Sequence, residues 1–185
     1  CLASRYRPVG KRLAIVTNGG GPGVLAADWV NEILLDLGRL SPESVAALKP
    51  QLPALASLAD LIDLSEEATP EHYRLAIDAA SRDRQIDGVL VIHSPKHGVD
   101  PAEIARAVAD VKRQMSKPLL SCWMGDATVV PARGVLLEAP ISARPKLLWA
   151  LSATLHRSTR TSNCCNKHRR RCRPWRGPTL RVRAC

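Results

Sequence analysis

Residues 13–23 read LAIVTNGGGPG, a short apolar run followed directly by a glycine-rich turn. The β-branched composition of residues 13–17 is typical of a strand that is buried on both faces. Residues 18–23 can continue neither a strand nor a helix, because their glycines and proline interrupt both patterns. Apolar side chains then recur at helical spacing over residues 24–37, until Gly38 ends the pattern. The stretch therefore predicts a strand, a tight turn and a helix in direct succession.

The same alternation continues along the chain. Apolar runs at residues 88–92 (GVLVI) and 118–123 (PLLSCW) predict two more buried strands, and residues 61–64 predict a short one. Further helices are expected at residues 41–48, 69–80, 100–115 and 129–138. The first three of them start with Ser, Thr or Asp followed by Pro, a pattern that caps helices. Because alternating strands and helices form parallel sheets through right-handed crossovers, the sequence predicts a three-layer, flavodoxin-like α/β domain with a mainly parallel sheet.

Length and composition agree with one packed domain and a remainder, since the chain has 185 residues of which 45% are hydrophobic. It contains no apolar run of about 18 residues and no basic start leading into a short apolar stretch, so we expect neither a membrane span nor a secretory signal. The first residue is Cys rather than Met, which suggests a fragment or a processed product. Only two isolated cysteines precede residue 140, which points to a reducing, cytoplasmic location.

Charge divides the chain into two parts. Residues 1–139 carry 15 of the 27 Lys and Arg and all 17 Asp and Glu, a balance of −2, whereas residues 140–185 carry 12 bases and no acid. We therefore distinguish a lead-in at residues 1–11, a domain at residues 12–139, and a basic tail, rich in Cys and Arg, at residues 140–185. The near-neutral domain argues against nucleic acid or a membrane surface as its partner.

Ligands of open parallel sheets bind beyond the carboxyl ends of the strands. The glycine-rich turn at residues 18–23 follows the first strand, and free N–H groups at the start of its helix would attract an anion. Its spacing matches neither GxGxxG nor GxxxxGKS/T, so the usual dinucleotide and Walker motifs do not apply. The alternative interpretation is a tight turn with a purely structural role.

Two other strand ends carry reactive side chains. Residues 93–97 (HSPKH) hold two His, but no Cys or carboxylate is spaced with them as a metal site requires, and His at a loop tip is usually solvated. Cys122 lies within a predicted strand and is expected to be an inert, buried thiol. No Ser–His–Asp arrangement stands out, so the sequence assigns no catalytic residue and no metal ligand.

Residues 12–28 (RLAIVTNGGGPGVLAAD) resemble the opening of the third module of NDP-forming acyl-CoA synthetases, a flavodoxin-like ligase domain also found near the C-terminus of the succinyl-CoA synthetase β subunit. The downstream order is similar as well: LSPESVAAL (40–48), LP (52–53), DLIDL (60–64) and KPLLSCWMGD (117–126). The pattern is most like that of bacterial proteins in which an acetate–CoA ligase-like region is fused to a GNAT lysine acetyltransferase. The resemblance covers about residues 10–139.

Members of that family convert acyl-CoA, phosphate and NDP to acid, CoA and NTP through an acyl phosphate and a phosphohistidine, and glycine-rich helix starts from two modules cradle the transferred phosphate. The resemblance therefore implies half of a phosphate site, formed by Asn18, Gly19, Gly20, Gly21 and Gly23. Nothing in this chain matches the phosphohistidine motif or the ATP-grasp domain. CoA, ATP or ADP, and Mg are thus expected on other modules, and none on this chain alone. The family's NPVDL is replaced by DLIDL at residues 60–64, a departure from its pattern.

The resulting hypothesis is a fragment of an ADP-forming acetate–CoA ligase, or the ligase-like region of a lysine acetyltransferase. Its partners would be phosphate or acyl phosphate and the CoA-binding, phosphohistidine and ATP-grasp modules of the same synthetase. Whether the chain is an enzyme stays open, because it lacks those modules. The alternative is a module that senses a ligand or contacts a subunit without catalysis, and a third class, a nucleic-acid-binding protein, would work through the tail.

The tail itself has three interpretations. Its basic run at residues 169–173 is typical of a nucleic-acid arm, and Cys165, His168 and Cys172 have loosely metal-like spacing. The third interpretation, which we favour, is translation out of frame. GC-rich DNA that is read in a shifted frame is rich in codons for Arg, Cys, Pro, Ser and Trp, as this tail is. Joining the last base of each codon to the next two forces Gly after Trp149 and permits FRTPEAAVGAF, which resembles the family's continuation. Such a tail should be disordered and leave a strand edge uncovered, with poor solubility.

Overall fold

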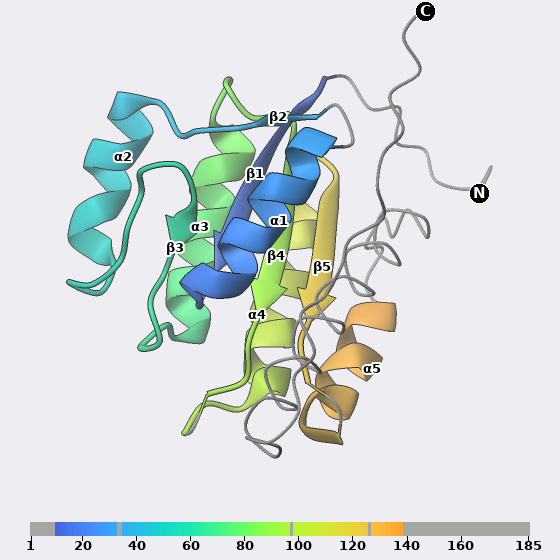
Figure 1. Cartoon of the computed structure of the whole chain (residues 1–185). Helices are drawn as coiled ribbons and strands as arrows, with labels where there is room; N and C mark the ends of the chain where they lie inside the picture. Colours follow the sequence, from blue (N-terminus) through green and yellow to red (C-terminus); the bar gives the residue numbers. More distant parts are fainter. Residues whose placement is uncertain (1–9, 33–34, 97, 126, 139–185) are drawn as a thin grey trace, which may run out of the picture.

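Five strands form one sheet in the computed structural model, which describes residues 10–32, 35–96, 98–125 and 127–138 (Figure 1). The strands are β1 (Arg12–Thr17), β2 (Asp36–Leu37), β3 (Ile62–Asp63), β4 (Gly88–His93) and β5 (Leu119–Trp123). Their order is β2–β1–β4–β5, β3 is also paired to β1, and all of these pairings are parallel. The predicted α/β fold with a mainly parallel sheet is confirmed, including the short strand β3.

Two short strands share one edge of β1. β2 pairs with the start of β1 at Arg12 and Leu13, and β3 pairs with its end at Val16 and Thr17. The opposite edge of β1 pairs with β4 from Leu13 to Thr17. The end of β1 is thus enclosed on both sides, and the turn that follows Thr17 emerges between the loops after β3 and β4.

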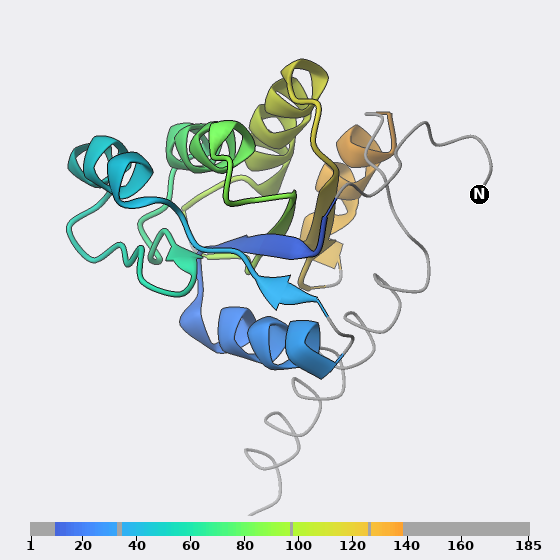
Figure 2. The same ribbon diagram turned by 90° about the horizontal axis from the view of Figure 1, so that it is seen from above.

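The helices cover the two faces of the sheet unequally. They are α1 (Gly20–Glu32), α2 (Pro42–Leu48), α3 (Pro70–Arg82), α4 (Pro101–Gln114) and α5 (Val130–Glu138), with the short 3-10 turns η1 (Lys49–Gln51) and η2 (Ala127–Val129). Figure 2 shows α1 on one side of the sheet and α3, α4 and α5 on the other. The described part of the chain is therefore a three-layer domain, as expected for a flavodoxin-like fold.

Successive residues of the strands alternate between two hydrophobic cores. Leu13 and Ile15 pack on the side of α1, whereas Ala14 and Val16 belong to the core formed with α3, α4 and α5. Complete burial of a side chain the size of Ile15 contributes roughly 1.5–3 kcal/mol to stability. Because both faces of β1, β4 and β5 are buried, continuous apolar runs rather than alternating patterns mark these strands in the sequence.

Three helices begin as the sequence predicts. α2, α3 and α4 each start with a proline, and the side chain of the residue before it accepts a hydrogen bond from a backbone N–H in the first turn. The capping residues are Ser41, Thr69 and Asp100. At α3 the cap is reciprocal, because Nδ1 of His72 accepts a hydrogen bond from the Thr69 N–H at 3.1 Å. A side-chain cap of this kind stabilises a helix by about 1 kcal/mol.

The start of the first helix differs from the prediction. α1 begins at Gly20, four residues before the expected start at residue 24. Glycine tolerates a helical backbone, and Pro22 lies in the first turn, where a helix uses no N–H as a donor. The glycine-rich segment is therefore divided between a turn and the first turn of the helix.

The end of the first helix was also predicted wrongly. α1 ends at Glu32, and Asp36–Leu37 form β2 instead of a last helical turn. The chain then passes close to the backbone of β1, since a Cβ on Gly38 would lie 3.2 Å from the Ala14 nitrogen. The helical spacing was misleading because Leu37 reaches the same core as α1, but from a strand.

The predictions for the two ends of the chain fall largely outside the described residues. These are the greater part of the lead-in (1–11) and all of the tail (140–185), with its disorder, its three interpretations and its effect on solubility. Within the described ranges, no helix combines the length and the apolar character that crossing a membrane requires.

Candidate functional site

The glycine-rich turn lies at the carboxyl end of β1, the edge of the sheet at which parallel α/β proteins bind ligands (Figure 1). Asn18, directly after β1, is 2% exposed. Gly20 and Gly21, the first two residues of α1, are exposed, whereas Gly23 is buried. The five predicted phosphate-binding residues are thus contiguous in space but differ in their access to a ligand.

Where the chain leaves the sheet after β1, the side chains of Thr17 and Asn18 form hydrogen bonds with the neighbouring backbone. Thr17 Oγ1 donates to the Gly19 carbonyl at 3.0 Å and accepts from the Gly19 N–H at 3.1 Å. The Asn18 amide donates through Nδ2 to the Ser94 carbonyl at 2.8 Å, and its Oδ1 accepts from the Ser94 N–H at 2.8 Å. The turn is therefore attached both to β1 and to the loop that follows β4.

The glycines of the turn have different reasons to be glycine. None has a positive φ, a conformation that the described glycines adopt only at Gly98 and Gly125. A Cβ on Gly23 would lie 2.9 Å from Thr17 Cγ2, so close packing explains this glycine. A Cβ on Gly21 would meet no atom within 4 Å. Neither backbone conformation nor packing against the described residues requires glycine at position 21, and the same holds for Gly134 in α5; Gly21 differs in lying in the first turn of α1, beside the carboxyl end of β1.

The start of α1 presents N–H groups that donate to no acceptor among the described residues. The Gly23 N–H donates to the Gly19 carbonyl at 3.3 Å, and Pro22 has no N–H. The N–H groups of Gly20 and Gly21 lie in the first turn, where no carbonyl of the helix is available as an acceptor, and so they point out of the helix at its start. No acidic side chain occupies this first turn, so the positive end of the helix dipole has no counter-charge from its own turn.

The last residue of β3, Asp63, contributes a carboxylate to the same edge. Asp63 Oδ2 lies 3.3 Å from the position that a Cβ on Gly20 would take, and its Oδ1 accepts from the Ser65 N–H at 3.0 Å. In the loops after β3 and β4, the Lys96 ammonium forms an ion pair with the Glu66 carboxylate, so the positive charge of Lys96 is already balanced. The negative charge of Asp63 would oppose an anion that approaches this edge.

Ser65 marks backbone strain beside this site. Its φ is +65°, and it is the one non-glycine residue with positive φ in the described part of the chain. A side chain in this left-handed region costs roughly 1–2 kcal/mol. The buried Ser65 Oγ also has no hydrogen-bond partner among the described residues. The strain lies directly after the DLIDL segment, at the point where this chain departs from the family pattern.

His93 is not the solvated loop residue that we expected. β4 extends through it, and its side chain is 1% exposed. Nδ1 lies 3.1 Å from the Tyr73 hydroxyl, and the ring packs 4.6 Å, centre to centre, from that of Trp123. Burial lowers the pKa of His93 to about 4, so the imidazole is neutral near pH 7. The second histidine of the predicted loop, at position 97, lies outside the described residues.

The Tyr73–His93 pair was missed because it joins α3 to β4 across the core. Burial raises the pKa of the Tyr73 hydroxyl, which therefore stays protonated and can donate to Nδ1. The remaining nitrogen, His93 Nε2, and Trp123 Nε1 have no partner among the described residues. The sequence did contain one signal for the burial of Tyr73: it lies one helical turn before Ile77, on the inward face of α3.

Cys122 fits the expectation of an inert thiol. It is buried on the side of the sheet covered by α1 and forms no disulfide. Burial raises the pKa of its thiol to about 11, so it is protonated near pH 7 and a poor nucleophile. The adjoining strand end holds Met124, whose Sδ accepts from the Ser94 hydroxyl at 3.4 Å.

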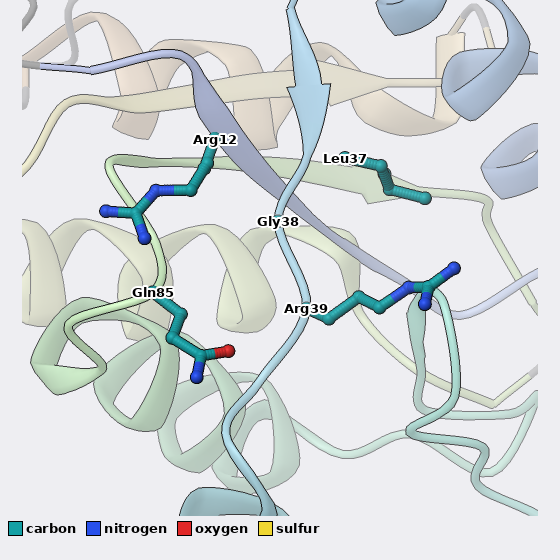
Figure 3. Close-up of a pocket in the computed structure, with 5 residues that line it drawn as sticks. All are labelled: Arg12, Leu37, Gly38, Arg39 and Gln85. Carbon is teal, nitrogen blue, oxygen red and sulfur yellow. The ribbon is translucent and has the colours of Figure 1, made fainter.

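A shallow pocket of about 290 Å³ lies at the opposite, amino end of the sheet. Figure 3 shows its lining residues, Arg12, Leu37, Gly38, Arg39 and Gln85, with the two arginine side chains directed apart. The Arg12 guanidinium binds both carboxylate oxygens of Asp87 at 2.9 Å, and Arg39 pairs with Asp60 at 2.7 Å. Both cations are compensated, so the pocket offers no free charge to an anion. In the described ranges no three His, Cys, Asp or Glu side chains converge as metal ligands.

The chain is similar in sequence to several known proteins. No family model matches it. It is 31% identical over 140 residues to ADP-forming acetate–CoA ligase I of Archaeoglobus fulgidus, covering 76% of this chain and 19% of that protein. It is 32% identical over 156 residues to the α subunit of ADP-forming acetate–CoA ligase II of Pyrococcus furiosus, covering 80% of this chain and 34% of that subunit. The chain is homologous to a part of the ADP-forming acetate–CoA ligases.

Solved structures also superpose on this chain. A protein of Pyrococcus horikoshii, PH0766, superposes with a TM-score of 0.69 at 27% identity, covering 76% of this chain and 34% of that one. The acetyl-coenzyme A synthetase 1 of Candidatus Korarchaeum cryptofilum, in complex with phosphate and ADP, gives a TM-score of 0.69 at 27% identity, over 89% of this chain and 37% of that chain. The chain thus spans about a fifth to a third of the curated ligases, so their complete activity does not transfer with the homology.

Proposed function

We propose that this chain is the flavodoxin-like ligase module of an ADP-forming acyl-CoA synthetase and that its glycine-rich turn supplies half of a phosphate site. The proposal rests on the first turn of α1 at the carboxyl end of β1, where Gly20 and Gly21 are exposed and a Cβ on Gly21 would meet nothing within 4 Å. Homology to ADP-forming acetate–CoA ligases supports a phosphate as the ligand. The phosphate complex of the K. cryptofilum synthetase supports it as well.

The chemistry of the half-site follows from the first turn of α1. The N–H groups of Gly20 and Gly21 would donate to phosphate oxygens, aided by the helix dipole, and the absent side chain at Gly21 would let the oxygens reach them. A hydrogen bond to a charged group contributes about 1.5–3 kcal/mol. Asn18, Gly19 and Gly23 would shape the turn, because their polar groups or their Cβ positions already contact the protein.

The remaining chemistry belongs to other modules of the complete protein. Conversion of acyl-CoA, phosphate and ADP to acid, CoA and ATP requires groups that hold CoA, nucleotide and Mg, and we assign none of these to this chain. We propose that a second glycine-rich helix start, on the phosphohistidine module, faces α1 and completes the phosphate site. This also accounts for Asp63, whose negative charge would be offset only when the second half is present.

The decisive experiment compares two glycines that both have open space. Gly21 and Gly134 lie in exposed helical positions where a Cβ meets nothing within 4 Å. In ¹⁵N-labelled full chain, millimolar inorganic phosphate should shift the Gly20 and Gly21 amide signals saturably. Gly21→Val should abolish this response, whereas Gly134→Val should leave it intact. If phosphate leaves the wild-type signals unmoved, or moves them equally in Gly21→Val, the chain has no phosphate half-site there.

A non-catalytic, ligand-sensing module is the second candidate. The DLIDL segment favours it, because Asp60 forms a surface ion pair with Arg39 where the family has Asn-Pro, and strained Ser65 follows. A chimera distinguishes the ligase module from the sensor. In it, residues 10–138 of this chain replace the corresponding segment of the P. furiosus α subunit. Retained ATP formation from acetyl-CoA, phosphate and ADP supports the ligase module, and phosphate binding without turnover supports the sensor. Fusion to a GNAT acetyltransferase is our proposal for the complete gene, which neighbouring coding sequence would test.

A further inference from the structure

The end of β1 shows how the glycine-rich turn is held in place. The ladder between β1 and β4 ends with the pair Thr17 and Ile92. If the ladder continued in the same register, Gly19 would lie opposite Ser94. The N–H and carbonyl of Gly19 bond to the Thr17 hydroxyl instead. The Asn18 side chain occupies the vacated place, because its amide bonds both the N–H and the carbonyl of Ser94 at 2.8 Å.

The Asn18 amide is fully specified by this arrangement. Oδ1 faces the Ser94 N–H and Nδ2 faces the Ser94 carbonyl, and a flipped amide would oppose donor to donor and acceptor to acceptor. The side chain is 2% exposed, so a ligand at the exposed Gly20 and Gly21 has no open path to it. Its polar atoms are therefore directed at the protein and not at the mouth of the site.

We propose that Asn18 is a positioning residue: it clamps the glycine-rich turn to Ser94 and thereby aims the N–H groups of Gly20 and Gly21, without touching the anion itself. The clamp lets the backbone of Gly19 turn into α1 while the end of β4 keeps its hydrogen bonds. The benefit for the anion rests on the proposed phosphate site, whereas the clamp itself is independent of it. Its effect reaches the ligand only through the direction of the two N–H groups.

The test uses ¹⁵N-labelled full chain in four forms: wild type, Asn18→Ala, Asn18→Asp and Ser41→Ala. Ser41 caps α2 at the amino end of the sheet and serves as the control, since Ser41→Ala loses the side-chain bonds to Ser44 but keeps the backbone bond to Asp83, away from the site. Asn18→Asp keeps an acceptor for the Ser94 N–H but loses the donor to the Ser94 carbonyl, and it provides a second variant if Asn18→Ala does not fold. Amide signals and hydrogen exchange are measured without ligand and then during titration with inorganic phosphate.

Before phosphate is added, Asn18→Ala should move the Gly20 and Gly21 signals and raise the exchange rate of the Ser94 amide about tenfold or more, because both bonds to Ser94 are lost. Asn18→Asp should keep the Ser94 amide protected, and Ser41→Ala should change neither readout. Phosphate affinity should fall roughly 3- to 10-fold in Asn18→Ala and stay constant in Ser41→Ala.

The outcomes separate the clamp from the phosphate site. Unchanged ligand-free Gly20, Gly21 and Ser94 signals in Asn18→Ala would overturn the positioning role, even where wild type binds phosphate. A loss of affinity with unchanged ligand-free signals would make Asn18 a direct ligand instead. If wild type does not respond to phosphate while the ligand-free signals move as expected, the clamp stands and the proposed phosphate function is wrong.

Discussion

Protonation of His93 should make the stability of this protein fall in mildly acidic solution. The imidazole is buried between Tyr73 and Trp123, and burial lowers its pKa from an ordinary 6.5 to about 4. Between these values the unfolded chain binds a proton that the folded chain does not, so the free energy of unfolding decreases as the pH falls. Each pKa unit corresponds to about 1.4 kcal/mol, which gives a loss of roughly 3 kcal/mol between pH 6.5 and 4.

This window can be separated from that of the carboxylates. A hydrogen bond from Arg12 lowers the pKa of Asp87 to about 2, and Asp83 reaches about 2 as well because bonds from backbone N–H groups outweigh its burial. Their stabilising effect is present above about pH 5 and is lost progressively below it. A loss of stability between pH 6.5 and 5 is therefore assigned to His93.

Urea denaturation at pH 7.0, 6.0, 5.0 and 4.5 measures the effect on wild type and on His93→Gln. Gln retains a hydrogen-bond acceptor for Tyr73 but cannot bind a proton in this range. We expect the variant to be less stable at pH 7 and to lose the pH dependence between 6.5 and 5. Equal slopes in wild type and His93→Gln would show that this histidine titrates normally and that the burial argument is wrong.

Three further expectations follow from the structure. Ser65→Gly should raise the free energy of unfolding by about 1 kcal/mol, because glycine relieves the positive φ and removes a buried hydroxyl without a partner, and a lower melting temperature would contradict this. Gly23→Ala should destabilise by about 1–3 kcal/mol, since its Cβ would lie 2.9 Å from Thr17 Cγ2, and an unchanged urea midpoint would refute the packing argument. The coding DNA of residues 140–185 should yield an FRTPE-like segment when shifted by one or two bases, and its absence in both shifted frames would exclude translation out of frame.

The sequence was sufficient for the strands whose two faces are buried. β1, β4 and β5 are continuous apolar runs, and the caps at Ser41, Thr69 and Asp100 act locally, so neither required knowledge of distant contacts. β2 was missed because Leu37 has the same hydrophobic signal in a strand as in the preceding helical pattern.

The candidate site was predictable in position but not in the roles of its residues. Glycines in a turn after a buried strand indicate the carboxyl edge of the sheet, yet only the surroundings distinguish Gly21, with open space, from Gly23, which packs against Thr17. The bonds from Asn18 to Ser94 and from Tyr73 to His93 join segments 76 and 20 residues apart. A single sequence carries no local signal for such pairs.

β2 and β3 share one edge of β1, and the segment between them is a detour that begins and ends beside that strand. Residues 38–61 follow β2 at the start of β1, build α2 and lead into β3 at the end of β1. Insertions in this detour, for example beside Leu55, which is 76% exposed, can be absorbed without displacing the turn after β1. A tag or a reporter can be built in there while the carboxyl end of the sheet keeps its shape.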